Sequence, residues 1–418
     1  MTDPVFDIVI VGAGAAGLTS AIFAGEALRQ RGASGRVGVV DGAKTVGAKI
    51  LVAGGGRCNV THAVVRTNDY NGPKNVVKNV LASFDEKRCV EWFASMDVQL
   101  KTEPTGKLFP VTDKARTVLD ALLNRCAQLG IPILTDHRVQ RLTAPDETGH
   151  FTLTTSQGPI RASCVVMATG GKSLPRTGSD GAGWEMLREL GHTVTPTHAA
   201  LVSLVCDASF FHAQMTGQAF EVELRTFVEG KLTDARTGSL LWTHFGLSGP
   251  VVMDASRHFT VARDHGRAVR MVCNMIPAMT TQTLDAWLLS RGSARPRANL
   301  STVLAELLPV KLLDVMLGWA GLDGSVTLSH LNKETRRAVV GLLTELPLPV
   351  TQFRGWNHAE VTAGGVPMTE VETKTMQSRV VPGLYLVGEL LDVDGRIGGF
   401  NFQWAWATGY LAGKAVAG

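Results

Sequence analysis

The first 41 residues carry the pattern that most restricts the fold. An apolar run from Val5 to Val11 enters the glycine turn Gly12-Ala13-Gly14-Ala15-Ala16-Gly17, and an alanine-rich stretch to about Arg31 follows. A second apolar run, Val37 to Val40, ends at Asp41. Together they form a βαβ unit, in which the glycine turn binds a pyrophosphate and the acid binds a ribose. The pattern predicts dinucleotide binding and leaves NAD and FAD equally open.

The size and composition favour an enzyme of more than one domain. The chain has 418 residues, which is more than one hydrophobic core usually serves. It is 45% hydrophobic and 19% charged, as is typical of globular proteins. No uncharged apolar run is long enough to cross a membrane, and Met1-Thr2-Asp3-Pro4 does not resemble a secretion signal, so we expect a cytoplasmic protein without a membrane partner.

Cysteine usage and net charge restrict the partners only partly. The six cysteines are scattered without a Cys-x-x-Cys pair, so we expect reduced thiols and no metal site. The net charge of +4 neither requires nor excludes a nucleic-acid partner.

Helices and strands alternate in the following part of the chain. From about Val80 to Gly130 we expect two amphipathic helices separated by a polar segment from Thr102 to Pro110. Phe151 to Ser156 and Ile160 to Met167 predict a hairpin-like pair of strands. The second of these strands runs into Ala168-Thr169-Gly170-Gly171, a further glycine turn.

Beyond His192 the pattern becomes that of an insert. Residues 195–275 contain short alternating stretches such as Phe220 to Arg225, which predict an antiparallel sheet or small barrel. Residues 282–346 have a helical pattern. The apolar strand Gly383 to Gly388 and a helix from about Gln403 then close the chain. We expect these last elements to complete the sheet of the first domain.

Two further glycine-rich segments favour FAD over NAD. Lys49 to Thr61 combines glycines with cations and small polar residues, which suits a loop that follows an extended, phosphate-bearing cofactor; a flexible surface loop is the alternative. Gly388-Glu389 follows an apolar strand, and Gly398 to Gln403 precedes the last helix. A carboxylate there can accept hydrogen bonds from a ribityl chain, and a helix N-terminus can face the pyrimidine edge of a flavin. NAD has no ribityl chain.

The same segments resemble the motifs of one known family. Lys49 to Thr61, Ala168 to Gly183, Thr243 to Pro250 and Gly388 to Ala405 are similar to motifs of the BaiN/RdsA-type flavoproteins and occur in the same order. The resemblance covers nearly the whole chain. It implies an α/β fold with a Rossmann-like FAD-binding domain of the GR2 type, an inserted β-barrel domain and a small helical domain. The implied boundaries are 1–194 and 351–418 for the two parts of the FAD-binding domain, 195–280 for the β-barrel insert and 281–350 for the helical insert.

The resemblance also implies cofactor-binding residues. Gly12, Gly14 and Gly17 would hold the pyrophosphate, and Asp41 would hold the adenosine ribose. Glu389 would stand where many other FAD domains have an aspartate. The full predicted set is Gly12, Gly14, Ala15, Ala16, Gly17, Asp41, Lys49, Gly56, Arg57, Cys58, Asn59, Thr61, Val139, Thr169, Gly170, Gly388, Glu389, Gly398, Gly399, Phe400, Asn401 and Gln403.

A few side chains can be interpreted either as reactive groups of a site or as structural residues. Cys58 follows a glycine run, as in flavoprotein disulfide reductases, but no second cysteine occurs before Cys89, so we interpret it as a packing residue. His244, in the insert, is the candidate proton donor, and a structural histidine is the alternative. Asp394 is interpreted as a turn residue, whereas Asp392 fits a turn and a site equally well.

Members of the resembled family are associated with reduction of activated or nucleobase carbon–carbon double bonds. We therefore expect an FAD-dependent oxidoreductase that reduces such a bond in a small molecule with hydride derived from NAD(P)H. NAD(P)H would be a transient reductant, because no second Gly-x-Gly-x-x-Gly follows a convincing strand. One alternative is a dihydrouridine-forming enzyme acting on ribosomal RNA, against which the near-balanced charge of the insert argues. The other is a flavin-binding redox sensor without turnover.

Overall fold

In the computed structural model, which describes residues 5–418, strand β1 (Val5–Val11) lies in the interior of a nine-stranded sheet. It pairs in parallel with β2 (Val37–Val40) on one side and with β10 (Gly158–Met167) on the other. β10 in turn pairs in parallel with β22 (Leu384–Leu386), which comes from the far end of the sequence. The prediction that C-terminal elements complete the first sheet is confirmed.

The remaining strands extend this sheet. The predicted hairpin is confirmed, since β9 (Phe151–Thr155) pairs antiparallel with β10. β8 (Val139–Thr143) pairs antiparallel with β9. β7 (Ile133–Leu134) lies beside β2, and the other edge is formed by β20 (Val371–Glu372) and β21 (Gln377–Ser378).

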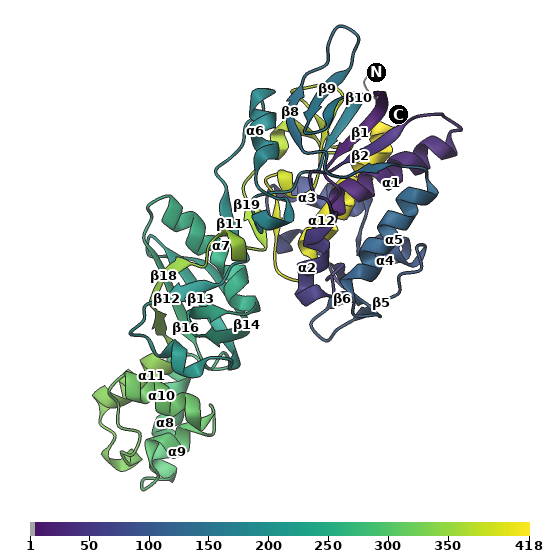
Figure 1. Cartoon of the computed structure of the whole chain (residues 1–418). Helices are drawn as coiled ribbons and strands as arrows, with labels where there is room; N and C mark the ends of the chain where they lie inside the picture. Colours follow the sequence, from purple (N-terminus) through teal and green to yellow (C-terminus); the bar gives the residue numbers. More distant parts are fainter. Residues whose placement is uncertain (1–4) are drawn as a thin grey trace. The chain divides into compact units, whose positions relative to one another are not determined.

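Helices α1 (Ala15–Gln30) and α12 (Phe400–Val416) pack against each other beside the sheet (Figure 1). Their backbones come close at Gly413, where an added Cβ would lie 2.5 Å from the carbonyl oxygen of Ser20. We expected α12 to begin at about Gln403, but it begins at Phe400. The difference arises because Gly399 has a positive φ of 92°, which glycine adopts freely, and the chain turns into the helix directly after it.

The segment between β2 and β7 is more finely divided than predicted. The first expected helix is two helices, α3 (Lys74–Ser83) and α4 (Glu86–Ala94), because Asp85 caps the second one by accepting from the amide of Arg88. The polar segment Thr102 to Pro110 is part of a small antiparallel sheet. Its strands are β3 (Thr61–His62), β5 (Leu100–Thr102) and β6 (Lys107–Pro110). The second expected helix is α5 (Ala115–Gln128).

The described chain forms two compact units, and the second one runs from Ala200 to Ala359. Its antiparallel sheet has the order β17-β16-β13-β14-β15-β12-β18, so the predicted antiparallel pairing is confirmed. The two edge strands follow one another in the chain and are separated only by Pro349. One bent segment therefore pairs with both ends of the sheet. The strands are β12 (Leu204–Cys206), β13 (Ala219–Val228), β14 (Lys231–Thr243), β15 (Gly246–Ser248), β16 (Val269–Asn274), β17 (Leu346–Leu348) and β18 (Val350–Phe353).

Helices cover and extend this second sheet. α7 (Pro250–Asp264) packs on β13 and β14; the sequence interpretation missed it because it treated residues 195–275 as strands. The helical pattern of residues 282–346 is confirmed by α8 (Thr281–Ala294), α9 (Leu300–Leu304), α10 (Val310–Trp319) and α11 (Lys333–Thr344). One hydrophobic cluster includes residues of the sheet and of these helices, which therefore share a core.

The contact between α1 and α12 gives a stability prediction. Gly413→Ala is expected to lower the free energy of unfolding by about 1–3 kcal/mol, because the new Cβ would press on backbone that cannot move aside. The matched control is Gly341→Ala in α11, where an added Cβ would meet no atom within 4 Å. The control should raise the free energy of unfolding by about 0.5–1 kcal/mol, since alanine favours helix. Chemical denaturation of both variants checks this, and equal stability of the two would contradict it.

Candidate functional site

The glycine turn after β1 has one tight side and one open side. Gly12 has a φ of 105°, and an added Cβ there would lie 2.5 Å from the carbonyl oxygen of Ala168. A Cβ on Gly17 would overlap the carbonyl oxygen of Gly12. Gly14 differs, because a Cβ there would meet nothing within 4 Å. Packing within the protein thus explains why positions 12 and 17 are glycines. Gly14 has no such contact, and a phosphate can approach its backbone closely.

The N-terminus of α1 suits an anion. Ala15 and Ala16 are its first helical residues, Gly14 is its N-cap without a side-chain hydrogen bond, and the first turn has no acidic residue. The first N–H groups of a helix and its positive dipole end favour a negatively charged ligand. The predicted pyrophosphate site therefore fits the geometry of this turn.

The side chain of Asp41 is hydrogen-bonded to the glycine turn. One carboxylate oxygen accepts from the amide of Ala13 at 2.7 Å, and the other accepts from the amide of Ala43 at 2.8 Å. Each oxygen has a second acceptor position, so a ribose hydroxyl could still donate to it. The ribose contact stays a prediction, while the structure shows that Asp41 also holds the turn in place.

Thr169 and Gly170 lie against the same glycine turn. A Cβ on Gly12 would be 3.4 Å from the Cα of Thr169, and Gly170 has a φ of 73°. The hydroxyl of Thr169 is buried and has no hydrogen-bond partner among residues 5–418. A buried hydroxyl without a partner is unusual and suits a site at which a ligand or water supplies one.

The segment from Lys49 to Thr61 is folded rather than a loose loop. α2 (Ala48–Gly56) is interrupted at Ala53 to Gly55, where the backbone leaves the helical region. Arg57 forms an ion pair with Glu103 at 2.6 Å and lies over the ring of Phe109 at 4.0 Å. Neither partner was predicted, because the hairpin that carries them was missed.

Cys58 is a packing residue in the structure. Its side chain is fully buried, and burial raises the pKa of its thiol to about 12. It also adopts a left-handed backbone conformation, with a φ of 60°. A thiol with this pKa is not a thiolate at neutral pH, so the interpretation against dithiol chemistry agrees with the structure.

The start of α12 is hydrogen-bonded to residues at and before β3 and to Phe84. Thr61 donates to the side-chain oxygen of Gln403 at 2.6 Å, and the Gln403 amide donates to the carbonyl of Phe84 at 2.6 Å. With its amide oriented to match donors with acceptors, Asn59 accepts from the amide of Gly399 at 3.1 Å. These predicted residues lie together, but Gln403 is fully buried and its amide already bonds to protein groups.

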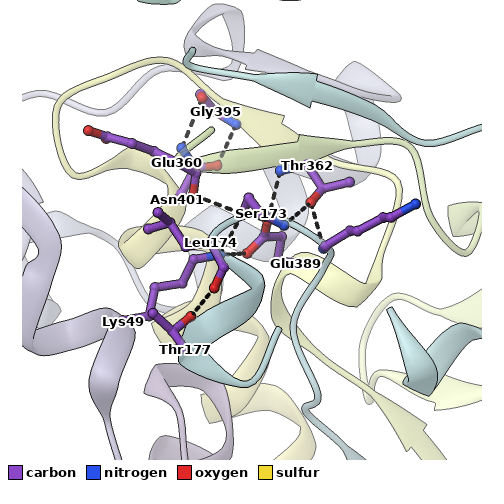
Figure 2. A network of polar contacts seen from close by, with 10 residues as sticks. Lys49, Ser173, Leu174, Thr177, Glu360, Thr362, Glu389, Gly395 and Asn401 are labelled. Carbon is purple, nitrogen blue, oxygen red and sulfur yellow. Dashed lines mark hydrogen bonds and ion pairs between the residues drawn. The ribbon is translucent and has the colours of Figure 1, made fainter. Parts of the chain in front are cut away.

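The turn that leads into α12 is also held by its own side chains. Asn401 accepts from the amide of Gly395 at 2.8 Å and donates to its carbonyl at 2.9 Å (Figure 2). Phe400 stacks on the ring of His62, with centroids 4.9 Å apart. Gly398 and Gly399 both have positive φ. Contacts of these residues with a cofactor stay predictions.

Lys49 and Glu389 form the most connected polar group of the site (Figure 2). Glu389, which follows Gly388 in the 3-10 turn Gly388–Leu390, lies 2.6 Å from the Lys49 ammonium. Its other oxygen accepts from the Ser173 hydroxyl at 2.9 Å and from the Thr362 amide at 2.7 Å. Ser173 lies in a segment of the family resemblance, whereas no sequence pattern marked Thr362.

Two predicted residues lie apart from these groups. Val139 is the buried first residue of β8, opposite Thr155. His244 lies in the second unit, in the turn between β14 and β15, where it is exposed and forms a T-shaped pair with Phe245, with ring centroids 5.1 Å apart. Their roles toward a cofactor or substrate stay predictions.

Metal and membrane features are absent from the part of the chain that the structure describes. Residues 5–418 contain no group of three or more histidines, cysteines, aspartates and glutamates that could hold a metal ion. Over the same residues, no helix is both long enough and apolar enough to span a membrane.

The parallel strands β2, β1, β10 and β22, the glycine turn with its open helix N-terminus and the Glu389 carboxylate are typical of a Rossmann-type flavoprotein oxidoreductase. Residues 6–415 match the family described as "HI0933-like protein Rossmann domain", and the chain belongs to this family of FAD-dependent oxidoreductases. The prediction of a BaiN/RdsA-type flavoprotein is thereby confirmed.

Curated relatives match the chain over almost its whole length. It is 32% identical over 411 residues to a "3-dehydro-bile acid delta(4,6)-reductase" of Clostridium scindens, with 98% of each chain covered. It is 33% identical over 415 residues to a "Ribosomal RNA dihydrouridine synthase" of Escherichia coli, with 98% of this chain and 97% of that protein covered.

Among solved structures, a 3-ketosteroid-delta4-(5alpha)-dehydrogenase from Rhodococcus jostii RHA1 has a similar fold. It has a TM-score of 0.51 and 15% identity over 100% of this chain and 98% of that chain. The Sdh1 complex of Mycobacterium smegmatis also gives a TM-score of 0.51, at 16% identity over 100% of this chain and 68% of that one. These likenesses concern the fold alone.

The burial of Cys58 predicts low reactivity. Iodoacetamide at pH 8 should leave Cys58 unmodified in the native protein and modify it in urea, because a thiol with a pKa of about 12 is almost entirely protonated at that pH. Peptide mass mapping of both samples measures this. Cys164, which is only partly buried, is the internal comparison. Modification of native Cys58 at the rate of a free thiol would contradict the prediction.

Proposed function

We propose that this protein is an FAD-dependent reductase of a carbon–carbon double bond conjugated to a carbonyl in a small molecule, with NAD(P)H as the source of hydride. The observation that carries the proposal is the 32% identity to a bile-acid reductase over 98% of both chains. A match of this extent includes the FAD-binding segments and the insert. It supports the same type of reaction and leaves the substrate open.

The described residues suit FAD in chemical terms. The amides at the start of α1 would hold the pyrophosphate, Asp41 the adenosine ribose, and Glu389 a hydroxyl of the ribityl chain. FAD, when bound, would accept hydride from a nicotinamide and deliver it to the polarised double bond. The protein then has to bind the substrate, exclude water and supply one proton.

His244 is the proposed proton donor. Histidine changes its charge near neutral pH, and it can donate to the carbon that becomes a carbanion when hydride arrives at the conjugated bond. It lies in an exposed turn, so its ring is accessible to a ligand. The absence of a second Gly-x-Gly-x-x-Gly after a strand supports transient use of NAD(P)H at the flavin.

A second candidate function is dihydrouridine formation on ribosomal RNA. The 33% identity to the Escherichia coli enzyme favours it, and its chemistry is of the same class, since uracil has a double bond conjugated to a carbonyl. RNA binding requires basic surfaces that neutralise phosphates. Residues 200–359 contain 15 lysines and arginines against 13 aspartates and glutamates, which favours the small-molecule substrate.

Anaerobic spectroscopy tests the proposed reaction. NADH or NADPH should bleach the bound FAD, and a 3-keto steroid with a conjugated double bond should restore the oxidised spectrum, with a product that gains two hydrogen atoms. Reduced FAD that the steroid leaves reduced, and that is reoxidised only when oxygen is then admitted, with a hydroxylated product, would contradict a reductase. FAD that stays oxidised with both nicotinamides would favour a redox sensor. Loss of dihydrouridine from ribosomal RNA of a deletion strain would favour the second candidate.

His244→Ala separates the two half-reactions. Reduction of the flavin by NAD(P)H should be unchanged, whereas its reoxidation by the double bond should slow by about 100-fold, because only this step uses the proton. Stopped-flow absorbance measures both rates. His330→Ala, which removes another exposed histidine of the second unit, is the control. Equal effects of the two substitutions would contradict the role of His244.

A further inference from the structure

Lys49 and Glu389 are opposite charges held together inside the FAD-binding unit. Their side chains are 26% and 19% exposed, and the ammonium nitrogen lies 2.6 Å from one carboxylate oxygen. The two residues come from distant parts of the chain, Lys49 from α2 and Glu389 from the turn after β22. Their contact is therefore built by the tertiary fold.

The hydrogen bonds of this pair do not use all of its donor and acceptor positions. Glu389 accepts from Lys49, from the Ser173 hydroxyl and from the Thr362 amide. A carboxylate has about four acceptor positions, so one remains. Lys49 donates to Glu389 and to Ser173 at 2.7 Å, and an ammonium has three N–H groups, so one remains. The pair can offer one acceptor and one donor to a ligand.

The surrounding backbone fixes the position of the carboxylate. The Thr362 hydroxyl accepts from the amides of Lys172 at 2.8 Å and Ser173 at 3.1 Å (Figure 2). A Cβ on Gly171 would lie 2.5 Å from this hydroxyl and 2.7 Å from the nearer oxygen of Glu389. The glycine turn after β10 and the strand β19 (Val361–Ala363) therefore close around Glu389.

We propose that Lys49 and Glu389 act on FAD as a balanced charge pair that sets the reduction potential of the flavin. Glu389 accepts a hydroxyl of the cofactor, and Lys49 donates its remaining N–H to a cofactor acceptor. Ser173 and Thr362 are positioning residues that hold Glu389. The inference rests on FAD binding and on no step of the proposed reaction, so it stands or fails independently of the substrate.

Charge explains the effect of the pair on the potential. Reduction by two electrons with uptake of one proton leaves a flavin with one more negative charge than before. A nearby cation makes this change more favourable, and a nearby anion makes it less favourable, most strongly where water is partly excluded. Each member of the pair therefore offsets the effect of the other.

Neutral replacements test the pair by the sign of their effects. Lys49→Met should lower the midpoint potential of the bound flavin, and Glu389→Gln should raise it. The double variant should lie near the wild-type value. Dye-coupled reductive titration with dithionite, with the protein in excess over FAD, measures all three, and Lys49→Arg should keep the wild-type potential because it keeps the charge. Shifts of the same sign in the two single variants, or a double variant whose potential lies far from the wild-type value, would overturn the proposal.

Retention of FAD gives a second measurement that does not depend on activity. Lys49→Met should weaken FAD binding by about tenfold, since it removes a charge-assisted hydrogen bond and leaves Glu389 without a cation. The matched control is Arg125→Met, because Arg125 forms an ion pair of the same length, 2.6 Å, with Glu26. The control should change neither FAD affinity nor potential. Equal losses in both variants would show a general loss of stability and overturn the proposal.

The positioning residues have their own signature. Thr362→Val removes the acceptor for two amides and should weaken FAD binding, while the midpoint potential stays within the error of the wild-type value because no charge changes. Thr362→Ser should restore the affinity. A shift of the potential in Thr362→Val as large as that in Lys49→Met would contradict the division between charge pair and positioning residues.

Discussion

The close approach of the Gly12 backbone to Ala168 is the constraint on which the rest of the FAD-binding unit depends. Only a residue without a Cβ allows β1 to turn there, because a Cβ on Gly12 would lie 2.5 Å from the carbonyl oxygen of Ala168, directly after β10. Because β1 and β10 are neighbours in the sheet, the turn after one strand lies against the turn after the other. The helix N-terminus, Asp41 and Thr169 thereby reach the same place. The order of the strands and the missing Cβ at Gly12 together bring these groups to one place.

Much of this part of the fold could be predicted, because its signals are local. The strand, turn and helix at residues 5–31 follow from apolar runs and glycines that act over a few residues. The hairpin before Ala168 has the same origin. α12 was placed about three residues too late, since nothing in the sequence marks the backbone angle of Gly399. α7 was missed because residues 250–264 lie between clear strands and were therefore predicted to be strand as well.

The sequence indicated many residues of the candidate site but few of the contacts between them. Lys49 and Glu389 stood in recognisable segments, but their pairing joins α2 to a turn near the C-terminus and depends on the completed sheet. Thr362 contributes its amide to Glu389 and its hydroxyl to two further amides, but a single threonine outside the recognised motifs gives no signal for these contacts. Gln403 shows the opposite case. A polar residue in a glycine-rich motif is typical of a ligand-binding position, and the structure shows two protein partners for its side-chain amide, while its contact with a cofactor stays a prediction.

The pairing of β22 with β10 and the packing of α12 on α1 have a consequence for how the protein is made. A ribosome releases the sheet's first strands long before residues 384–416, and the whole second unit is synthesised in between. Until then, one edge of β10 has no strand partner, and the face of α1 that packs on α12 is uncovered. A chain that ends before α12 keeps an unpaired strand edge and an uncovered helix face, which are the features that favour aggregation.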